Sequence, residues 1–472
     1  MKYALLGALT LLALAGPAEA QRRPDAEDMK LVGYNDLQGR PAYAPVIHEQ
    51  NGRWIAYIGE LGGKEGDERP MNPLTRRREN NGTAIVDVTD PRHPKYLHHI
   101  PGAAGSGDEG GAEMARVCDG KTLPKADPKK TYLLRTFGSA AHEIWDITNP
   151  VKPELLASIQ GEEGTHKNWW ECDTGIAYLV SGAPGWRVHR MTQIYDLSNP
   201  EHPVFIRNFG LVGQQPGASG AVPPPLHGPI STGPKGNRVY FGYGGDKDGV
   251  LQIVDRQKLL SGKKDPTPEN LLYPQVGRLN LSAFSGINTA FPVLGMPIAE
   301  FAHDAEPMRN FVVATGAAEV PECQEPRQMA LFIDVTSEER PMVVSSYTPP
   351  EVSGDFCTRG GRFGTYASNE NMTPIFYGKL VFFAALNAGV RAVDMRDPYH
   401  PIEAAHYIPE LTPRGQPVCA TVEGNQHCVK VIQTNDVEVD DRGYIYIVDR
   451  AGNGMHILQL TGATKRIADF SK

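Results

Sequence analysis

The sequence predicts an all-β protein, a seven-bladed β-propeller in which a strand near the N-terminal end completes the last blade. Three observations lead to this prediction. A short phrase of the form Asp-x-x-Asp/Asn-Pro-x-x-Pro recurs along the chain, each copy follows a run rich in β-branched and aromatic residues, and the last unit has one strand fewer than the others. Repeats built from strands alone are typical of propellers, whose blades are four-stranded sheets around a channel.

The recurring phrase marks seven units. Copies lie at residues 87–94, 146–153, 196–203 and 394–401, with a degraded copy at 334–341. Two further units keep the strand but not the prolines, at 251–255 and at 455–459, where Gln replaces the Asp. The marked positions are separated by 59, 50, 59, 79, 60 and 65 residues, which is enough for four short strands in each unit.

Within one unit the expected strands follow a fixed order. In the third unit a polar segment at 165–170 leads to an apolar strand at 175–181, the strand with the Asp follows, and a fourth strand lies at 204–209. The prolines suit the connection before the fourth strand, because proline has no N–H group for a central ladder. Asp and Thr before the prolines can close the turn through side-chain hydrogen bonds.

The last unit supplies only three strands, at 434–438, 443–448 and 455–458. We expect residues 30–35 to complete this blade, because such closure removes the sheet edge that an open array would expose. The alternative is a pair of β-sandwiches, which the length of the chain would allow. The regular spacing of the phrase and the missing strand favour the propeller.

Residues 1–20 have the pattern of a secretory signal peptide. Lys2 precedes an apolar run at 4–15, and residues 18–20, Ala-Glu-Ala, form a small-residue cleavage site. We therefore expect residues 21–472 to form a single propeller domain that is periplasmic or secreted. A retained N-terminal anchor is the alternative, which the cleavage site disfavours. No other stretch approaches the ~20 apolar residues of a spanning helix, so no membrane span is expected.

Six cysteines in an exported chain predict disulfide bonds. The blade order selects the pairs Cys118–Cys172, Cys323–Cys357 and Cys419–Cys428. The first pair joins the ends of first strands in blades two and three. The second pair joins loops of blades five and six on one face, and the third flanks a loop that leads into blade seven. The absence of a Cys-x-x-Cys motif disfavours a thiol redox centre or a zinc finger.

Charge and short motifs exclude several classes of function. The net charge is −8, and no basic stretch alternates with aromatic residues, so nucleic-acid binding is not expected. No Ser-His-acid order is legible. No Gly-rich phosphate loop follows a strand and opens a helix, since residues 242–249 look like a tight hairpin connection.

Two segments of the chain resemble a known repeat. The phrase at 85–91, Ile-Val-Asp-Val-Thr-Asp-Pro, and the segment 435–458 are similar to the LVIVD repeat of bacterial exported propellers. The likeness covers essentially the whole chain after residue 20, and it implies a seven-bladed propeller outside the cytoplasm without implying a reaction. The expected fold is also similar to that of the selenium-binding and methanethiol-oxidase propellers, in which histidines near the channel hold a metal. This second likeness is one of fold alone.

The first strands of the blades should begin at the mouth of the central channel, where propellers usually bind ligands. His166 and His227 start these strands in adjacent blades, and imidazole is a common ligand of zinc, copper and iron. Glu113, Glu370 or His48 could complete a transition-metal site. Guanidinium groups near the same mouth would favour a carboxylate or phosphate. The candidate ligand-binding residues are His166, His227, Asn168, Arg327, Arg362, Asn387, Arg391 and Asn435.

A structural role is the main alternative for these residues. Polar side chains around a water-filled channel need no ligand, and each arginine could pair with an acid and hold two blades together. We expect a propeller that binds a small molecule or an envelope protein at the channel-mouth face. The enzyme alternative is a metal-dependent oxidoreductase or hydrolase that uses His166 and His227. The third possibility is a structural scaffold for other envelope proteins.

Overall fold

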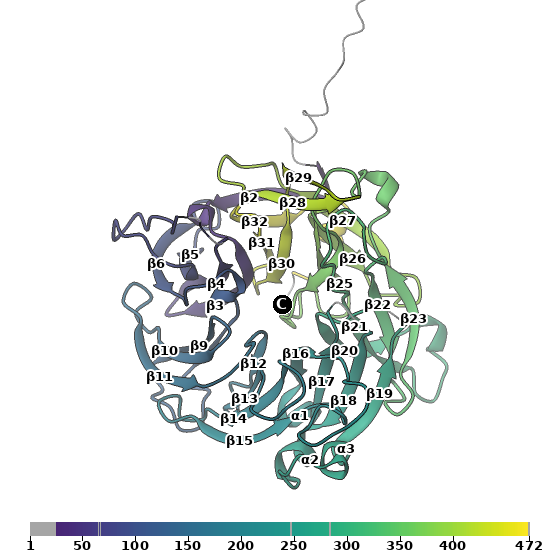
Figure 1. Cartoon of the computed structure of the whole chain (residues 1–472). Helices are drawn as coiled ribbons and strands as arrows, with labels where there is room; N and C mark the ends of the chain where they lie inside the picture. Colours follow the sequence, from purple (N-terminus) through teal and green to yellow (C-terminus); the bar gives the residue numbers. More distant parts are fainter. Residues whose placement is uncertain (1–24, 65, 67, 246–247, 283–284, 471–472) are drawn as a thin grey trace, which may run out of the picture.

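In the computed structural model, seven four-stranded antiparallel units form a ring around a central channel (Figure 1). The structure describes residues 25–64, 66, 68–245, 248–282 and 285–470, so the signal peptide expected at 1–20 lies outside the described residues. Four units are separate sheets, one has a fifth strand, and two are joined into one nine-stranded sheet. The predicted all-β, seven-bladed propeller is confirmed.

Each blade runs from an inner strand at the channel to an outer strand at the rim. Blades one and two consist of β3 (Ala42–Gln50), β4 (Arg53–Gly62), β5 (Gly82–Asp87) and β6 (Lys95–Pro101), then β8 (Ala115–Asp119), β9 (Thr131–Phe137), β10 (Ala141–Asp146) and β11 (Glu154–Gln160). Blades three and four consist of β12 (Asn168–Trp170), β13 (Ile176–Ser181), β14 (Met191–Asp196) and β15 (Val204–Phe209), then β16 (Leu226–Ser231), β17 (Arg238–Tyr243), β18 (Val250–Asp255) and β19 (Gln275–Asn280).

The remaining blades follow the same pattern. Blades five and six consist of β20 (Ala290–Pro297), β21 (Met308–Ala314), β22 (Ala330–Asp334) and β23 (Met342–Tyr347), then β24 (Phe363–Ser368), β25 (Leu380–Leu386), β26 (Val390–Asp394) and β27 (Ile402–Ile408). Blade seven consists of β30 (Thr434–Val439), β31 (Tyr444–Asp449), β32 (Met455–Leu460) and β2 (Met29–Asn35).

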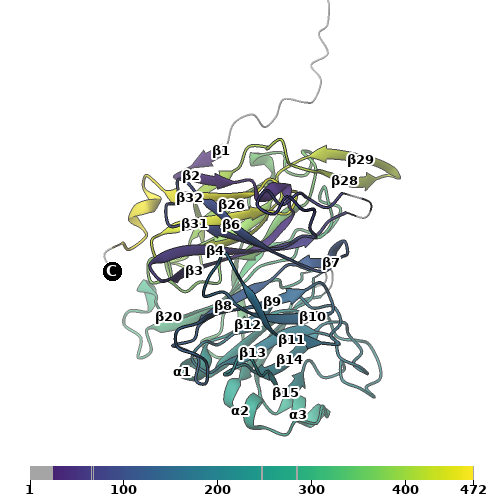
Figure 2. The same ribbon diagram turned by 90° about the vertical axis from the view of Figure 1, so that its left-hand side faces the viewer.

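Short elements lie outside the blades. The helices are η1 (Leu37–Gly39), α1 (Gly233–Gly236), α2 (Arg256–Ser261), α3 (Pro268–Leu272), η2 (Ala299–Phe301), η3 (Glu351–Ser353) and η4 (Thr464–Arg466). None of the helices in the described part of the chain is long and apolar enough to cross a membrane. The additional strands are β1 (Asp25–Glu27), β7 (Gly107–Ala112), β28 (Pro417–Val422) and β29 (Asn425–Lys430). Figure 2 shows β7 and the β28–β29 hairpin toward one face of the ring and α1 toward the other.

The recurring phrase folds as two successive turns that are closed by side chains. The carboxylate of Asp87 accepts a hydrogen bond from the backbone N–H of Thr89 (2.9 Å), and that of Asp90 accepts one from Arg92 (3.1 Å). The same pair of bonds recurs in the three other full copies. The Asp and Asn of the phrase therefore set the path from the third strand of a blade to the fourth.

The N-terminal segment closes the ring, as predicted. Strand β2 pairs with β32, with Met29 opposite Leu460 and Asn35 opposite Met455. Just before it, β1 adds to β27, the outer strand of blade six. The same segment therefore joins the last two blades and covers the edge of each.

All three predicted disulfide bonds are present. The pair Cys118–Cys172 links blades two and three, and Cys323–Cys357 links loops of blades five and six, each with a Cα separation of 5.3 Å. The third pair, Cys419–Cys428, staples the β28–β29 hairpin across opposite residues, with a Cα separation of 4.0 Å.

The core is formed by apolar side chains that pack between neighbouring blades. One cluster joins blades three and four through buried aromatic residues such as Tyr178, Phe209 and Phe241. Burial of each side chain of this size stabilises the fold by roughly 1.5–3 kcal/mol. The ring is thereby held rigid, and the inner strands are left to line the channel with polar groups.

Candidate functional site

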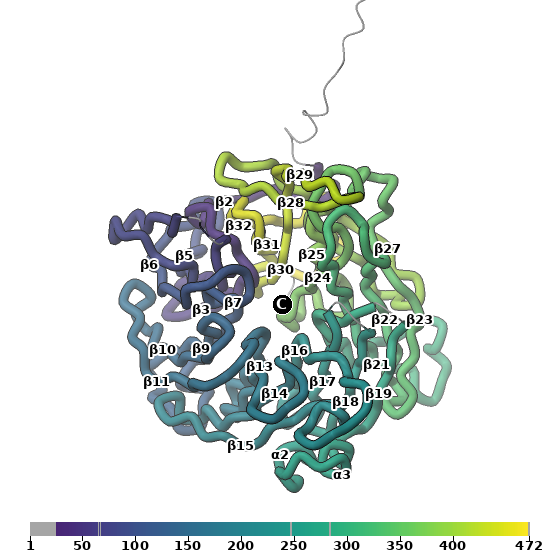
Figure 3. The backbone as a smooth tube through the Cα atoms, viewed as in Figure 1, coloured from purple at the N-terminus to yellow at the C-terminus, as the bar shows by residue number. Residues whose placement is uncertain are grey.

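A cavity of about 440 Å³ lies at the mouth of the channel. It is bordered by β7, which pairs with β4 and crosses the inner edge of blade one (Figure 3). The other walls come from the starts of inner strands and from the loops beside them. The lining residues are Asp108, His166, His189, Arg190, Pro225, Leu226, His227, Gly245, Glu319, Arg362, Tyr366 and Arg450.

Two histidines from adjacent blades meet in the wall of this cavity. His166 lies just before β12 and His227 lies in β16, and both are almost fully buried. Their Nε2 atoms are 3.2 Å apart, with the rings edge to face. The hydroxyl of Tyr43 lies 3.1 Å from the same Nε2 atom of His166, and a Glu113 oxygen lies 2.5 Å from its Nδ1 atom. The predicted proximity of the two imidazoles and of Glu113 is present.

The protonation of His227 follows from a chain of hydrogen bonds. The Lys167 ammonium, which can only donate, bonds the Thr289 hydroxyl oxygen (2.9 Å). That hydroxyl donates to Oδ1 of Asn288 (3.1 Å), which leaves the Asn288 amide nitrogen facing Nε2 of His227 at 3.3 Å. In this arrangement Nε2 of His227 accepts from Asn288 and carries a lone pair, and the proton lies on Nδ1, which has no hydrogen-bond partner among the described residues.

Two protonation states fit the contacts of His166. With Glu113 ionised, His166 donates from Nδ1 and its Nε2 carries a lone pair. With Glu113 protonated, Glu113 donates to Nδ1, and the Nε2–H of His166 points at His227. Burial, with Asp108, raises the pKa of Glu113, and burial, with Arg190, lowers the pKa of His166. The second, uncharged state is therefore favoured when only the protein is present.

Two of the arginines in the cavity wall are paired with carboxylates. Arg190 bonds Asp108 of β7 (3.1 Å), and Arg362 bonds Glu319 (2.6 Å). Each pair brings together residues that are distant in the chain. These two cations are therefore balanced by acids of the protein.

Arg450 differs from the other two arginines. It follows β31 and donates to the side-chain oxygen of Asn435 (3.1 Å), and its guanidinium lies 5.6 Å from the ring centroid of Tyr366. Within the described residues, no carboxylate forms an ion pair with it. The cavity thus has three guanidinium groups against two ionised carboxylates when Glu113 is protonated, and it favours an anion.

Only some of the residues predicted to bind a ligand lie at this cavity. His166, His227 and Arg362 line the cavity, and Asn435 holds Arg450. Asn168 is fully buried beside the channel, and both polar atoms of its side chain lack a hydrogen-bond partner among the described residues.

The other predicted residues do not reach the cavity. Arg327 is exposed in the loop between β21 and β22. Asn387 donates to the carbonyls of Phe356 and Gly360, and Arg391 bonds Glu403 on β27 (3.0 Å). These two side chains hold loops and strands of blade six, because they point into the blade rather than along the channel.

His48 also lies apart from the two central histidines. It bonds Asp119 (3.0 Å) and lines a separate cavity of about 190 Å³ with Arg116, Trp169 and Glu438. Glu370 lies in that same cavity, where it pairs with Arg116 and with Lys167 (3.1 Å). Neither His48 nor Glu370 contacts His166 or His227, so the predicted metal set reduces to the two histidines with Glu113.

Sequence reasoning missed several groups in the cavity. Asp108 comes from β7, which belongs to no repeat unit, and Arg190 and Glu319 come from loops whose path the repeat does not determine. Tyr43 and Asn288 precede or begin first strands, at positions equivalent to those of His166 and His227. That equivalence was the one sequence signal that could have found them.

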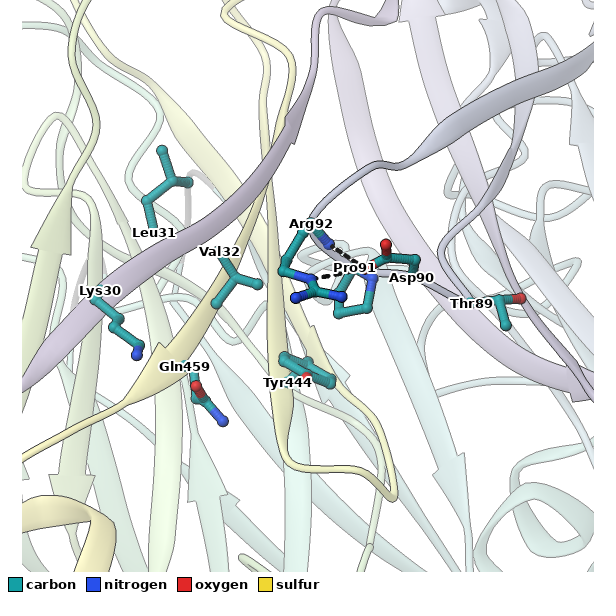
Figure 4. A pocket seen from close by; sticks show the side chains of 9 residues that line it. All are labelled: Lys30, Leu31, Val32, Thr89, Asp90, Pro91, Arg92, Tyr444 and Gln459. Carbon is teal, nitrogen blue, oxygen red and sulfur yellow. Dashed lines mark hydrogen bonds and ion pairs between the residues drawn. The ribbon is translucent and has the colours of Figure 1, made fainter.

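A larger hollow, of about 640 Å³, lies at the rim where β2 completes blade seven (Figure 4). Leu31 in its wall is 45% exposed. Among the described residues, the ionic contacts of its lining are those of Asp90 with Arg92 and with His93, within one turn. Its polar groups do not converge, so it is not a candidate functional site.

Comparison with known proteins adds no family. No protein-family description and no curated protein matches the chain. Sqt1 of Chaetomium thermophilum is 9% identical over 92% of this chain and 98% of its own, with a TM-score of 0.49. A structure of U3-55K is 11% identical over 92% and 98%, with a TM-score of 0.48. Raptor of Chaetomium thermophilum is 8% identical over 94% of this chain, which spans only 29% of Raptor, with a TM-score of 0.48.

Proposed function

We propose that this protein is a binding module whose channel-mouth cavity holds a small organic anion with a carboxylate group. The guanidinium of Arg450, which forms no direct ion pair with a carboxylate among the described residues, is the observation that supports the proposal. Arg190 and Arg362 already form ion pairs with carboxylates of the protein. Arg450 bonds the Asn435 amide and the Tyr366 side chain, and Glu319 and Asp108 act on it only from beyond ion-pair distance. A ligand carboxylate would supply the missing partner.

The form of the cavity fits such a ligand. Its volume of about 440 Å³ is within the usual range for small-molecule sites. The planar guanidinium group binds a carboxylate through two parallel N–H donors. His227 and Tyr366 add rings that can contact the carbon part of the ligand. Phosphate shares the charge and the acceptor atoms, and it is the competing ligand in the test.

The test is isothermal titration of the full, disulfide-bonded chain with succinate and with inorganic phosphate at constant ionic strength. We expect succinate to bind, and Arg450→Gln to weaken its binding about 10-fold or more, since a charge-assisted hydrogen bond contributes roughly 1.5–3 kcal/mol. Arg396→Gln is the matched control, because Arg396 is an exposed arginine that pairs only within its own turn.

The outcomes separate the possibilities. Equal loss of binding in Arg450→Gln and Arg396→Gln would mean a general charge effect and would contradict the proposal. Binding of phosphate but not of succinate would replace the carboxylate with an inorganic anion. Absence of binding by either probe to a protein with an unchanged circular dichroism spectrum would reject an anion site.

We further propose that the chain is exported, as a propeller of the LVIVD-repeat type. The three disulfide bonds and the signal-like residues 1–20 support this. We expect cell fractionation to recover a protein that begins near residue 21 in the extracytoplasmic fraction, with all six cysteines oxidised. Recovery of a reduced, uncleaved chain from the cytoplasm would contradict this.

A further inference from the structure

We propose that His166, His227 and Tyr43 bind one divalent transition-metal ion beside the anion cavity. This inference goes beyond the proposed anion binding and does not depend on it, because the three donors belong to the protein. The Nε2 atoms of the two histidines face each other at 3.2 Å, and the Tyr43 oxygen is 3.1 Å from that of His166. The Nε2 atom of His166, from blade three, thus has a donor atom from blade four and another from blade one within 3.2 Å.

The spacing of the two nitrogens suits a shared ion. Imidazole nitrogens lie about 2.0–2.1 Å from zinc, so two of them in a tetrahedral site are about 3.3 Å apart. The observed 3.2 Å is close to that value. The rings are 4.5 Å apart between centroids and nearly perpendicular, at 81°. Only small shifts of the side chains would place an ion between them.

The surroundings direct the lone pair of His227 to the meeting point, and they allow His166 to present one there when Glu113 is ionised. The chain from Lys167 through Thr289 and Asn288 assigns the lone pair of His227 to Nε2. Glu113 lies at Nδ1 of His166, which is the side opposite to the meeting point. A carboxylate at the far nitrogen is the usual partner of a metal-binding histidine, because it fixes the tautomer and strengthens the ligand.

The chemistry of the donors selects the class of metal. Two imidazoles and a phenol oxygen suit zinc or copper, whereas calcium and magnesium prefer several carboxylate or carbonyl oxygens. Asp108 is the additional acid nearby, since its carboxylate and the donor atoms of Glu113 and His166 lie within 4.8 Å of one another. Asp108 also lines the cavity, so the remaining coordination position would open toward the anion site.

The alternative to a metal ion between the two Nε2 atoms is a proton shared by the two histidines. With Glu113 protonated, the Nε2–H of His166 would donate to His227, and the 3.2 Å contact would be an ordinary hydrogen bond. In that case the protein would have no affinity for the ion above that of any exposed histidine. Metal titration of the full chain therefore separates the two possibilities.

The experiment uses the folded chain after removal of metal with a chelator, titrated with Zn²⁺ alone and with Cu²⁺ alone. We expect one ion per chain for each metal. His227→Ala should weaken binding about 100-fold or more, because loss even of a group that supports a ligand typically costs 10–100-fold. His48→Ala is the matched control, since His48 bonds Asp119 away from this point, and it should bind as the unchanged protein does.

A second readout needs no variant at the histidines. The Cu²⁺ complex of the unchanged protein should show hyperfine coupling to two nitrogens in its electron paramagnetic resonance spectrum. Tyr43→Phe should remove any phenolate-to-copper absorption band while leaving both nitrogens bound. Arg450→Gln should still bind one ion with coupling to two nitrogens, because Arg450 supplies no donor to the metal, so failure of the anion proposal and failure of this one can be told apart.

Three results would overturn the inference. One is an unchanged protein that retains less than a tenth of an equivalent of either metal after desalting. Another is a copper spectrum with coupling to fewer than two nitrogens. The last is an equal effect of His227→Ala and His48→Ala on metal affinity in proteins with the same far-ultraviolet circular dichroism.

Discussion

At the scale of single residues, the partner of each buried cation decides its role. Arg135 is fully buried and donates to Glu143 and to the carbonyls of Ile100 and Pro101, so it ties blade two to blade one. Arg391 has a similar structural role in blade six through Glu403. The structural alternative therefore fits the contacts of these two arginines.

Removal of the Arg135 side chain, which joins blades one and two, should lower the stability of the fold. We expect Arg135→Leu to lower the free energy of unfolding by roughly 3–5 kcal/mol, because it leaves the buried carboxylate of Glu143 without a cation and with only the Trp145 N–H as a donor. Urea unfolding measures this. Arg53→Leu, which removes a half-exposed pair with Asp87, should cost at most ~1 kcal/mol. A loss of under ~1 kcal/mol for both variants would contradict a stabilising role for the contacts of Arg135.

Two acids at the other end of the channel should make stability depend on pH. Burial raises the pKa of Glu438 from 4.5 to about 8 and that of Asp436 from 3.8 to about 7. The folded state therefore holds protons that the unfolded chain releases, so stability is fully present at low pH and falls as the pH rises from about 4 to about 8.

Glu438→Gln tests this dependence, since the amide keeps the oxygen that accepts from the N–H groups of Asn371 and Val439 and loses only the longer bond from the Glu370 N–H. We expect the melting temperature to fall less between pH 5 and pH 8 in this variant than in the unchanged protein. Glu154→Gln, at an exposed acid, is the control. The same pH slope in all three proteins would show that Glu438 is ionised throughout.

At this scale the sequence predicted some of the site and not the rest. Equivalent positions in neighbouring blades brought His166 and His227 together, because inner strands begin at the same mouth. The side-chain direction of Arg391 was not predictable from its place near the end of a strand. Residues alternate between the two faces of a strand, so an error of one residue in register reverses the direction. Arg391 is such a case, because in the structure it pairs in register with His406 of the outer strand β27.

At the scale of elements, the carboxylate of the repeated Asp accepts a backbone hydrogen bond in two different structures, a turn and a helix cap. In the full copies its carboxylate closes a turn on the N–H two residues later. In the unit without prolines, Asp255 caps α2 by accepting from the N–H of Lys258 (2.9 Å). The sequence predicted the strand and the Asp of this unit but not the helix that replaces the turn.

The cap should be measurable on its own. We expect Asp255→Ala to lower the free energy of unfolding by ~1 kcal/mol and Asp255→Asn to cost much less, because Asn retains the accepting oxygen. Chemical denaturation compares the two variants. An equal loss for both would point instead to the charge of Asp255, which has Arg238 at 3.9 Å.

Elements outside the repeat were the ones that sequence reasoning missed. Strand β7 carries Asp108 to the cavity through a Gly-rich segment, and a Cβ atom on Gly111 would lie 2.2 Å from the Glu60 carbonyl oxygen. The close approach of two backbones explains the glycine. No repeated phrase marks such a segment, so its contribution to the site could only be found in three dimensions.

At the scale of the whole molecule, the sequence predicted the ring and its closure. The missing strand of blade seven and the three cysteine pairs all followed from the order of the blades, and the structure confirms them. The alternative of two sandwiches is wrong. The addition of β1 to blade six was not expected, because a three-residue pairing leaves little trace in sequence.

Ring closure makes a prediction about assembly. A chain that begins at Asp36 lacks β1 and β2, which exposes the edges of β27 and β32. We expect this variant to form higher oligomers or aggregates, since open strand edges pair with other chains. Size-exclusion chromatography with light scattering would show this. A monomer with an unchanged melting temperature would contradict the role of the N-terminal strand.

The central claim is that the channel mouth binds an anion, and a crystal structure of the full chain grown with succinate tests it most directly. The account predicts density for one succinate in the cavity, with a carboxylate oxygen about 2.7–3.2 Å from a nitrogen of Arg450. Crystals of Arg450→Gln grown in the same way should lack it. A cavity that contains only water at saturating succinate, or succinate bound only in the rim hollow beside Leu31, would contradict the claim.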